Sequence, residues 1–166
     1  MKRLLFACLF VSIALAVFAA DHPNLLQAQQ LIDKAIAKVT AAQKANADAL
    51  GGYAAQAKDA LTSAKKEIKL AVEAADTATD ATKLFGVLQA LLGGDQDTSP
   101  AMDVLRKKHP NLAEAQDLIY QAHAKIRDAQ TANEFDMGGH AKKALDDLAT
   151  AAGLIRKAAE YANSHE

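Results

Sequence analysis

The chain contains the same stretch of sequence twice. His22-Pro23-Asn24-Leu25 opens a stretch that ends near Asp76, and His109-Pro110-Asn111-Leu112 opens a second stretch that ends near Asn163. The two stretches are offset by 87 residues (109 − 22) and align without a gap, with about half of the aligned positions identical. The match indicates a duplicated structural unit, so the fold has to be one that two copies of a small unit can build.

Within each copy, apolar residues recur at alternating spacings of three and four, the heptad pattern of an α-helix packed along a seam. The seam of the first half of each copy consists of Leu25, Ala28, Ile32, Ala35, Val39, Ala42 and Asn46, and of Leu112, Ala115, Ile119, Ala122, Ile126, Ala129 and Asn133. The seam of the second half consists of Ala54, Ala57, Leu61, Ala64, Ile68, Ala71 and Ala75, and of Ala141, Ala144, Leu148, Ala151, Ile155, Ala158 and Ala162. Each copy therefore predicts two helices.

Turn and cap residues mark the ends of these helices. Asn24 with Gln27, and Asn111 with Glu114, have the spacing of a capping box after a proline. The glycine pairs at 51–52 and 138–139 suit the left-handed turn at which a helix ends and the chain reverses. Each copy is thus predicted to be an antiparallel hairpin of two helices, each of roughly 22 residues and about 33 Å long.

Alanine in the seam lets two helix backbones approach closely, but it buries little area per residue. We expect the seam to join the two helices of one hairpin, and a second apolar edge to join the hairpins into an all-α four-helix bundle. That edge consists of Leu31, Ile36, Leu70 and Val72 in the first copy and of Leu118, Leu145 and Leu154 in the second. The alternative is two independent hairpins on a flexible tether.

The first residues have the pattern of a secretory signal peptide. Lys2 and Arg3 precede an apolar run from Leu4 to Phe18, and cleavage after Ala19 places small residues at the required positions. An uncleaved anchor is the alternative, although the run falls short of the ~20 residues that span a membrane. The expected divisions are a signal peptide (1–19), a first hairpin (20–78), a helical connector (79–108) and a second hairpin (109–166).

Composition excludes several functions of the exported chain. The only cysteine is Cys8, which lies in the signal segment, so disulfides and thiol catalysis are not expected after cleavage. Loss of Lys2 and Arg3 would change the formal net charge from −1 to −3 (−1 − 2), which does not suit electrostatic binding of nucleic acid. No combination of nucleophile, base and orienting group is apparent, so we do not expect an enzyme, and no stable membrane span is expected after cleavage.

The connector is predicted to contain two short helices. The first begins at Thr79 or Asp80 and ends at Gly93-Gly94, and its apolar face consists of Leu84, Phe85, Val87, Leu88, Leu91 and Leu92. The second begins at Ser99-Pro100 and carries Met102, Val104 and Leu105. The first helix either caps one end of the bundle or forms an exposed face, with Leu84, Phe85, Leu88 and Leu91, for an unknown protein partner.

The histidines are the candidate metal ligands: His22, His109, His123, His140 and His165. In an antiparallel hairpin, His109 lies opposite His165 at the open end, and His22 would join them if the hairpins pack with their open ends together. The alternatives are a role at the start of a helix for His22 and His109, and packing for His123, whose counterpart in the first copy is Ile36. The counterpart of His140 is Tyr53.

The run Gly138-Gly139-His140-Ala141-Lys142-Lys143-Ala144, followed by alanines at heptad spacing through Ala158, resembles the small metal-binding proteins of the bacterial periplasm. That resemblance implies a signal peptide, a four-helix bundle of similar repeats, and binding of copper, nickel or related divalent ions through histidines. His140 is in the position that most resembles the family, and His123 is a second candidate.

These patterns together predict an exported, non-enzymatic helical bundle in the periplasm or outside the cell. The expected role is that of a structural or binding module of the cell envelope. The alternative is weak binding or buffering of copper or nickel through histidines.

Overall fold

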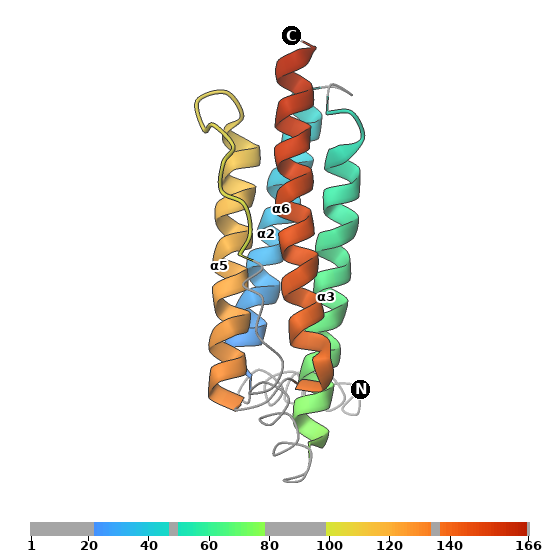
Figure 1. The fold of residues 1–166 in the computed structure, drawn as a ribbon, viewed down its shortest axis with the longest axis vertical. Helices are drawn as coiled ribbons and strands as arrows, with labels where there is room; N and C mark the ends of the chain where they lie inside the picture. The colour runs from blue at the N-terminus through green and yellow to red at the C-terminus, as the bar shows by residue number, and fades with distance from the viewer. Residues whose placement is uncertain (1–21, 47–49, 79–98, 134–136, 166) are drawn as a thin grey trace, which may run out of the picture.

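The computed structural model describes residues 22–46, 50–78, 99–133 and 137–165, and four long helices account for most of them (Figure 1). Helices α2 (Pro23–Ala45) and α3 (Tyr53–Thr77) form the first hairpin. Helices α5 (Pro110–Asn133) and α6 (His140–Ser164) form the second, with a one-turn 3-10 helix η1 (Met137–Gly139) between them. The predicted all-α four-helix bundle is confirmed.

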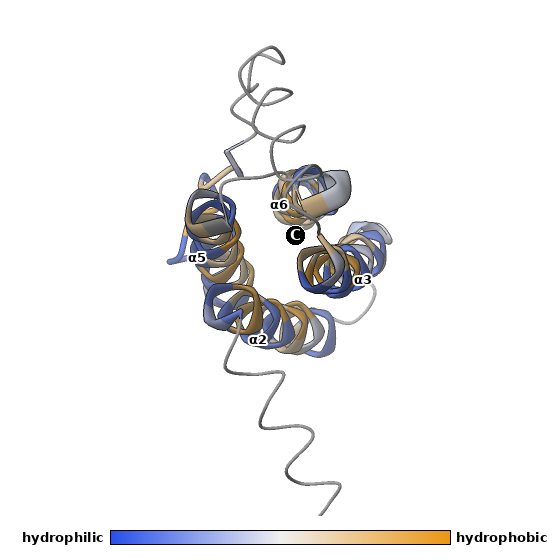
Figure 2. Ribbon diagram, turned by 90° about the horizontal axis from the view of Figure 1, so that it is seen from below, coloured by the Kyte–Doolittle hydropathy of each residue, from blue (hydrophilic) through white to orange (hydrophobic). Residues whose placement is uncertain are grey.

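The core follows the seams that the heptad pattern marks. Viewed along the bundle, the apolar sides of the four helices turn inward (Figure 2). The larger seam residues are fully buried: Leu25, Ile32, Val39, Leu61, Ile68, Leu112, Ile119, Ile126, Leu148 and Ile155. The alanines between them are buried as well, so each helix contributes one face to a single continuous core.

The pairing of the helices differs from the prediction. The most extensive helix–helix contacts are those of α2 with α5 and of α3 with α6, whereas the two helices of one hairpin share less extensive contacts. The seams therefore join equivalent helices of different hairpins, whereas the sequence pattern predicts that they join the two helices of one hairpin. The physical reason is that all four helices carry the same alanine-rich seam, so a close contact is equally available to any pair.

The two hairpins run in opposite directions. In Figure 1, α2 and α6 point one way along the bundle while α3 and α5 point the other, so each close pair is antiparallel. The two glycine turns consequently lie at opposite ends of the bundle. The end of α3 and the start of α5 are also at opposite ends, separated by about 36 Å, the length of a 24-residue helix.

The turns form as predicted, but the helix starts do not. Gly51, Gly52, Gly138 and Gly139 all have positive φ angles, between 56° and 79°. The predicted capping box at Asn24 is wrong, because α2 begins with Pro23 at its first position and has no side-chain cap. Proline suits that position because its missing N–H would have no partner within the helix.

The predicted second connector helix is also wrong. Residues 99–105 have no regular secondary structure, and 106–108 form a turn. Two prolines, at 100 and 110, restrict this short segment, and a helix of so few residues gains little from its own hydrogen bonds. The predicted helix of residues 79–94, with Leu84 and Phe85, lies outside the described residues.

Within the described residues, no helix combines the length and the apolar character that a membrane span needs.

Candidate functional site

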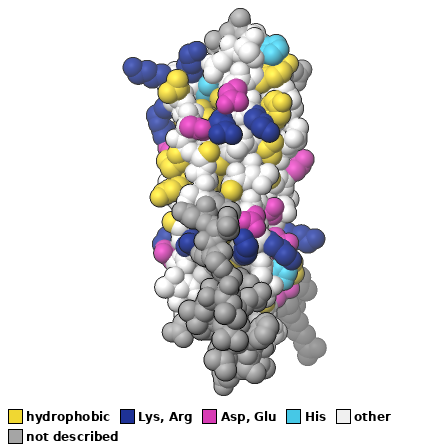
Figure 3. Space-filling model, in the orientation of Figure 1, with side chains coloured by type: hydrophobic (Ala, Val, Ile, Leu, Met, Phe, Trp, Pro, Cys, Tyr) yellow, Lys and Arg dark blue, Asp and Glu magenta, His cyan; other side chains and the backbone are white. Residues whose placement is uncertain are grey.

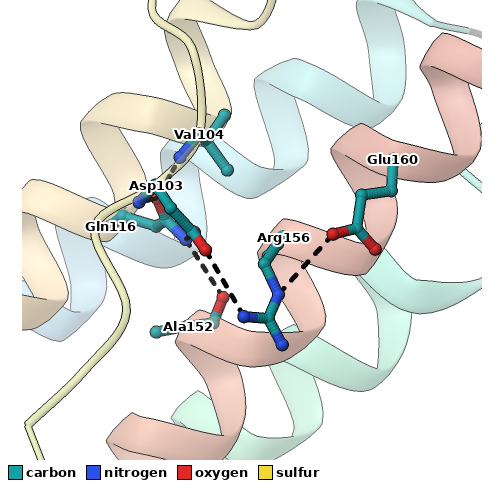
Figure 4. A network of polar contacts seen from close by, with 6 residues as sticks. All are labelled: Asp103, Val104, Gln116, Ala152, Arg156 and Glu160. Carbon is teal, nitrogen blue, oxygen red and sulfur yellow. Dashed lines mark hydrogen bonds and ion pairs between the residues drawn. The ribbon is translucent and has the colours of Figure 1, made fainter.

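Residues 99–108, hereafter the strap, lie against the outer face of α5 and α6. Pro100 is buried, and Ala101 and Val104 pack against the core. The strap contacts Gln116 on α5 and Arg156 on α6, and it runs along the second hairpin toward the start of α5 (Figures 1 and 4). The strap is the part of the segment between the two repeats that the structure describes.

Gln116 holds the strap in place. Its side chain is 2 % exposed, and its Oε1 accepts the backbone N–H groups of Asp103 at 3.1 Å and Val104 at 3.0 Å. Its Nε2 donates to the carbonyl oxygen of Ala152 at 3.2 Å and to Oδ1 of Asp103 at 3.2 Å. Because a buried amide is costly unless its donors and acceptor are paired, this arrangement specifies one position of the strap.

Charged residues surround this amide at the surface. Arg156 lies 3.4 Å from the carboxylate of Asp103 and 3.7 Å from that of Glu160 (Figure 4). Arg106 of the strap pairs with Asp117 of α5. These pairs are largely exposed, so each contributes little to stability, and their main effect is to orient the strap.

The second hairpin buries three positions on α5 and α6 that the first hairpin leaves at least partly exposed. Ala113, Leu145 and Ala152 of the second hairpin are buried, whereas their counterparts Leu26, Lys58 and Lys65 are not. Lys65 instead forms an ion pair with Asp33 between α2 and α3. The second copy is thus smaller or more apolar at these positions of α5 and α6, and this exchange is the signal in the sequence that other residues cover the second hairpin.

The strap brings apolar side chains to the surface. Met102 is 53 % exposed, Leu105 is 66 % exposed, and Tyr120 of α5 is 47 % exposed. Met102 and Leu105 flank the two residues whose N–H groups Gln116 holds, and Tyr120 lies one helical turn beyond Gln116 on α5. We call these three residues the strap surface. In the upper half of the view in Figure 3, apolar side chains lie among charged ones.

Two histidines connect helix ends at equivalent positions of the repeats. His22 Nε2–H donates to Oδ1 of Asp76 at 3.0 Å, and His109 Nε2–H donates to Oδ1 of Asn163 at 3.2 Å. Asp76 and Asn163 correspond in the two copies, so each hairpin closes its open end with the same contact. This geometry agrees with the predicted role of His22 and His109 at the start of a helix.

The predicted meeting of three histidines does not occur. His109 and His165 lie at one end of the bundle and His22 at the other, because the hairpins are packed in opposite directions (Figure 1). The ring of His165 stacks on Tyr161, with centroids 3.9 Å apart, and Tyr161 meets Tyr53 edge to face. An aromatic cluster thus forms at this end.

His140 is joined to a carboxylate of the other hairpin. Its Nδ1 lies 2.7 Å from Oε2 of Glu67 on α3, and both side chains are mostly buried. His123 is buried on α5, as the packing interpretation expected. Among residues 22–46, 50–78, 99–133 and 137–165, no three His, Cys, Asp or Glu side chains converge on a point that could hold a metal ion. Copper or nickel binding by these histidines stays a prediction.

Comparison with known proteins finds no match: no family model, no curated protein and no solved structure is similar to the chain.

Proposed function

We propose that this chain is an exported, non-enzymatic helical bundle that serves as a binding module of the cell envelope, with the strap surface as its contact site. The observation that carries the proposal is the exposure of Met102, Leu105 and Tyr120 around a rigidly held strap. On the surface of a soluble protein, large exposed apolar side chains usually occur singly. A group of them beside charged residues is typical of a site that contacts another protein.

The polar contacts of the bundle support a structural scaffold. His22 and His109 connect helix ends, and Gln116 holds the strap, so these groups are engaged within the fold. Export rests on the signal pattern of residues 1–19. The role of the bundle is then to present the strap surface to a partner in the envelope.

Export is tested by fractionating cells that express the full chain and sequencing the amino terminus of the product. We expect the protein in the exported fraction, with Ala20 as its first residue. Recovery of the uncut chain in the cytoplasm would contradict the export half of the proposal.

Binding is tested by placing a photo-crosslinking amino acid at Met102 or at Tyr120 in cells. Exposed positions on the first hairpin, Lys34 and Asp59, are the matched controls. We expect both strap-surface positions to yield the same crosslinked species and both controls to yield none. Equal crosslinking at all four positions, or none at any, would remove the strap surface as the contact site.

Weak binding of copper or nickel is the second candidate, because two histidines each face a carboxylate. His22 with Asp76 and His140 with Glu67 would each supply two ligands, and an ion would need further ligands from water or a partner. Calorimetric titration with Cu²⁺ or Ni²⁺ at pH 7 and pH 5 tests it, since binding to histidine weakens when the ring is protonated. Absence of pH-dependent binding tighter than about 100 μM, or binding unchanged when His22 and His140 are both replaced by Ala, would contradict this candidate function.

A further inference from the structure

The two hairpins present equivalent surfaces to each other. Each helix packs most closely against its own repeat equivalent, α2 against α5 and α3 against α6, and each pair is antiparallel (Figure 1). The seam residues that meet are equivalent too, since Leu25 and Ile32 correspond to Leu112 and Ile119. This is the arrangement of a twofold dimer of hairpins, in which one surface recognises a copy of itself.

Close contacts at the ends of the bundle follow the same symmetry. A Cβ atom on Gly51 would lie 2.7 Å from the ring of Tyr161, and one on Gly138 would lie 3.3 Å from Cβ of Ala74. Positions 51 and 138 correspond in the repeats, and so do 74 and 161. Each glycine turn therefore packs against the equivalent position of the opposite hairpin, as a twofold relation between the hairpins requires.

Only residues 79–108 join the hairpins covalently, and the strap part belongs to the second hairpin. By way of Asp103, Arg106 and Lys108, the strap contacts Gln116 and Asp117 on α5 and Arg156 and Asn163 on α6. The second hairpin would keep its strap whichever first hairpin it is packed against. The contacts between hairpins are the shared core and ion pairs such as Lys38 with Glu114 at 2.8 Å.

We propose that the seam surfaces also let the first hairpin of one chain pack against the second hairpin of another, so that a second copy of this chain is a binding partner when the connector is too short or when chains refold together at high concentration. Connector length then decides which pairing forms. A connector long enough to span the bundle holds its own hairpins at an effective concentration in the millimolar range, which favours the single-chain bundle. A connector too short to span the bundle leaves exchange between two chains as the way to build the same core.

The decisive variant removes residues 79–102 from the full chain. Eight residues, 78 and 103–109, then remain between Thr77 and Pro110, and they span at most about 32 Å, less than the roughly 36 Å between the end of α3 and the start of α5. We expect this variant to keep the helical content of the parent and to have twice its molar mass by light scattering. A matched control replaces 79–102 with a Gly/Ser linker of equal length, and it should stay monomeric. A folded monomer from the shortened chain would overturn the proposal.

A second experiment covers the case in which the shortened chain does not fold. Lys38→Cys and Glu114→Cys are made in separate full chains that also carry Cys8→Ser, and the two proteins are unfolded together and refolded. A short bismaleimide should then join the chains, with a yield that rises with protein concentration during refolding. Both substitutions in one chain provide the positive control for reach, and mixing without unfolding provides the background. A yield no higher than that background at any concentration up to about 1 mM would overturn the proposal.

Discussion

At the scale of single residues, the fold depends on where alanine and glycine stand. Alanine occupies seam positions at which two backbones come close together, and the fully buried Ala64 on α3 is typical. Glycine occupies positions at which the backbone needs a positive φ, and at Gly51 it also leaves room for a ring of the other hairpin. Substitutions at these two kinds of site therefore distinguish the contribution of side-chain packing to stability from that of backbone conformation.

Ala64→Leu should destabilise the bundle. The added side chain would enter a seam already filled to 0 % exposure, and overpacking of that kind costs about 1–3 kcal/mol. Ala55→Leu, at an exposed position of the same helix, is the control and should change the free energy of unfolding by no more than about 0.5 kcal/mol. Urea unfolding measures both, and equal stabilities would mean that Ala64 does not face a partner helix.

Gly51→Ala should cost more than Gly52→Ala. Both residues have a positive φ, at 56° and 76°, so both variants carry the conformational penalty of about 1 kcal/mol. Only at Gly51 would the new Cβ meet Tyr161, whereas nothing lies within 4 Å at Gly52. Thermal unfolding of the pair isolates the contact with Tyr161, and indistinguishable melting temperatures would contradict it.

At the scale of elements, the sequence predicted the helices well because their seams repeat over 23–25 residues and in two copies. The strap escaped prediction for a physical reason. Met102, Val104 and Leu105 have helix-like spacing, but a short segment takes its conformation from the surface that it contacts. That surface includes Gln116 and Arg156, which are distant from each other in sequence. Gln116 has an identical counterpart, Gln29, that holds no strap in the described residues.

Gln116→Leu should loosen the strap. The N–H groups of Asp103 and Val104 would lose their acceptor, and we expect a loss of about 1–3 kcal/mol of stability together with faster hydrogen exchange at these two amides. Gln29→Leu, the equivalent change in the first hairpin, is the matched control and should leave both amides protected. Exchange rates that respond equally to the two substitutions would show that Gln116 is not what holds the strap.

The contacts between helix ends should accept each other's residues. Asp76→Asn places in the first hairpin the residue that the second has at Asn163, and its amide oxygen can still accept from His22. We expect a change within about 0.5 kcal/mol, against a loss of about 0.5–1.5 kcal/mol for Asp76→Leu, which removes the acceptor. Chemical denaturation compares the two, and a large loss for Asp76→Asn would indicate that charge, and not the hydrogen bond, matters.

At the scale of the whole molecule, the four helices of the bundle could be predicted but their pairing could not. The heptad pattern states that each helix has one apolar seam, and all four seams are alike, so the pattern does not say which helix meets which. The same limit applies to the histidines. His22 was expected near His109 and His165 only if the hairpins had their open ends together, and the reversed packing places it at the far end.

The fold depends above all on the antiparallel packing of α2 against α5 across the repeats. Spin labels at Lys38 and Glu114, whose side chains are 2.8 Å apart, should report a short distance. Labels at Lys38 and Lys125 should be farther apart, because Lys125 lies 11 residues or about 16 Å along α5 from Glu114. Pulsed electron paramagnetic resonance on the two doubly labelled chains measures both distances. The fold requires the 38–114 distance to be the shorter, and a shorter 38–125 distance, as parallel packing of the repeats would produce, would contradict it.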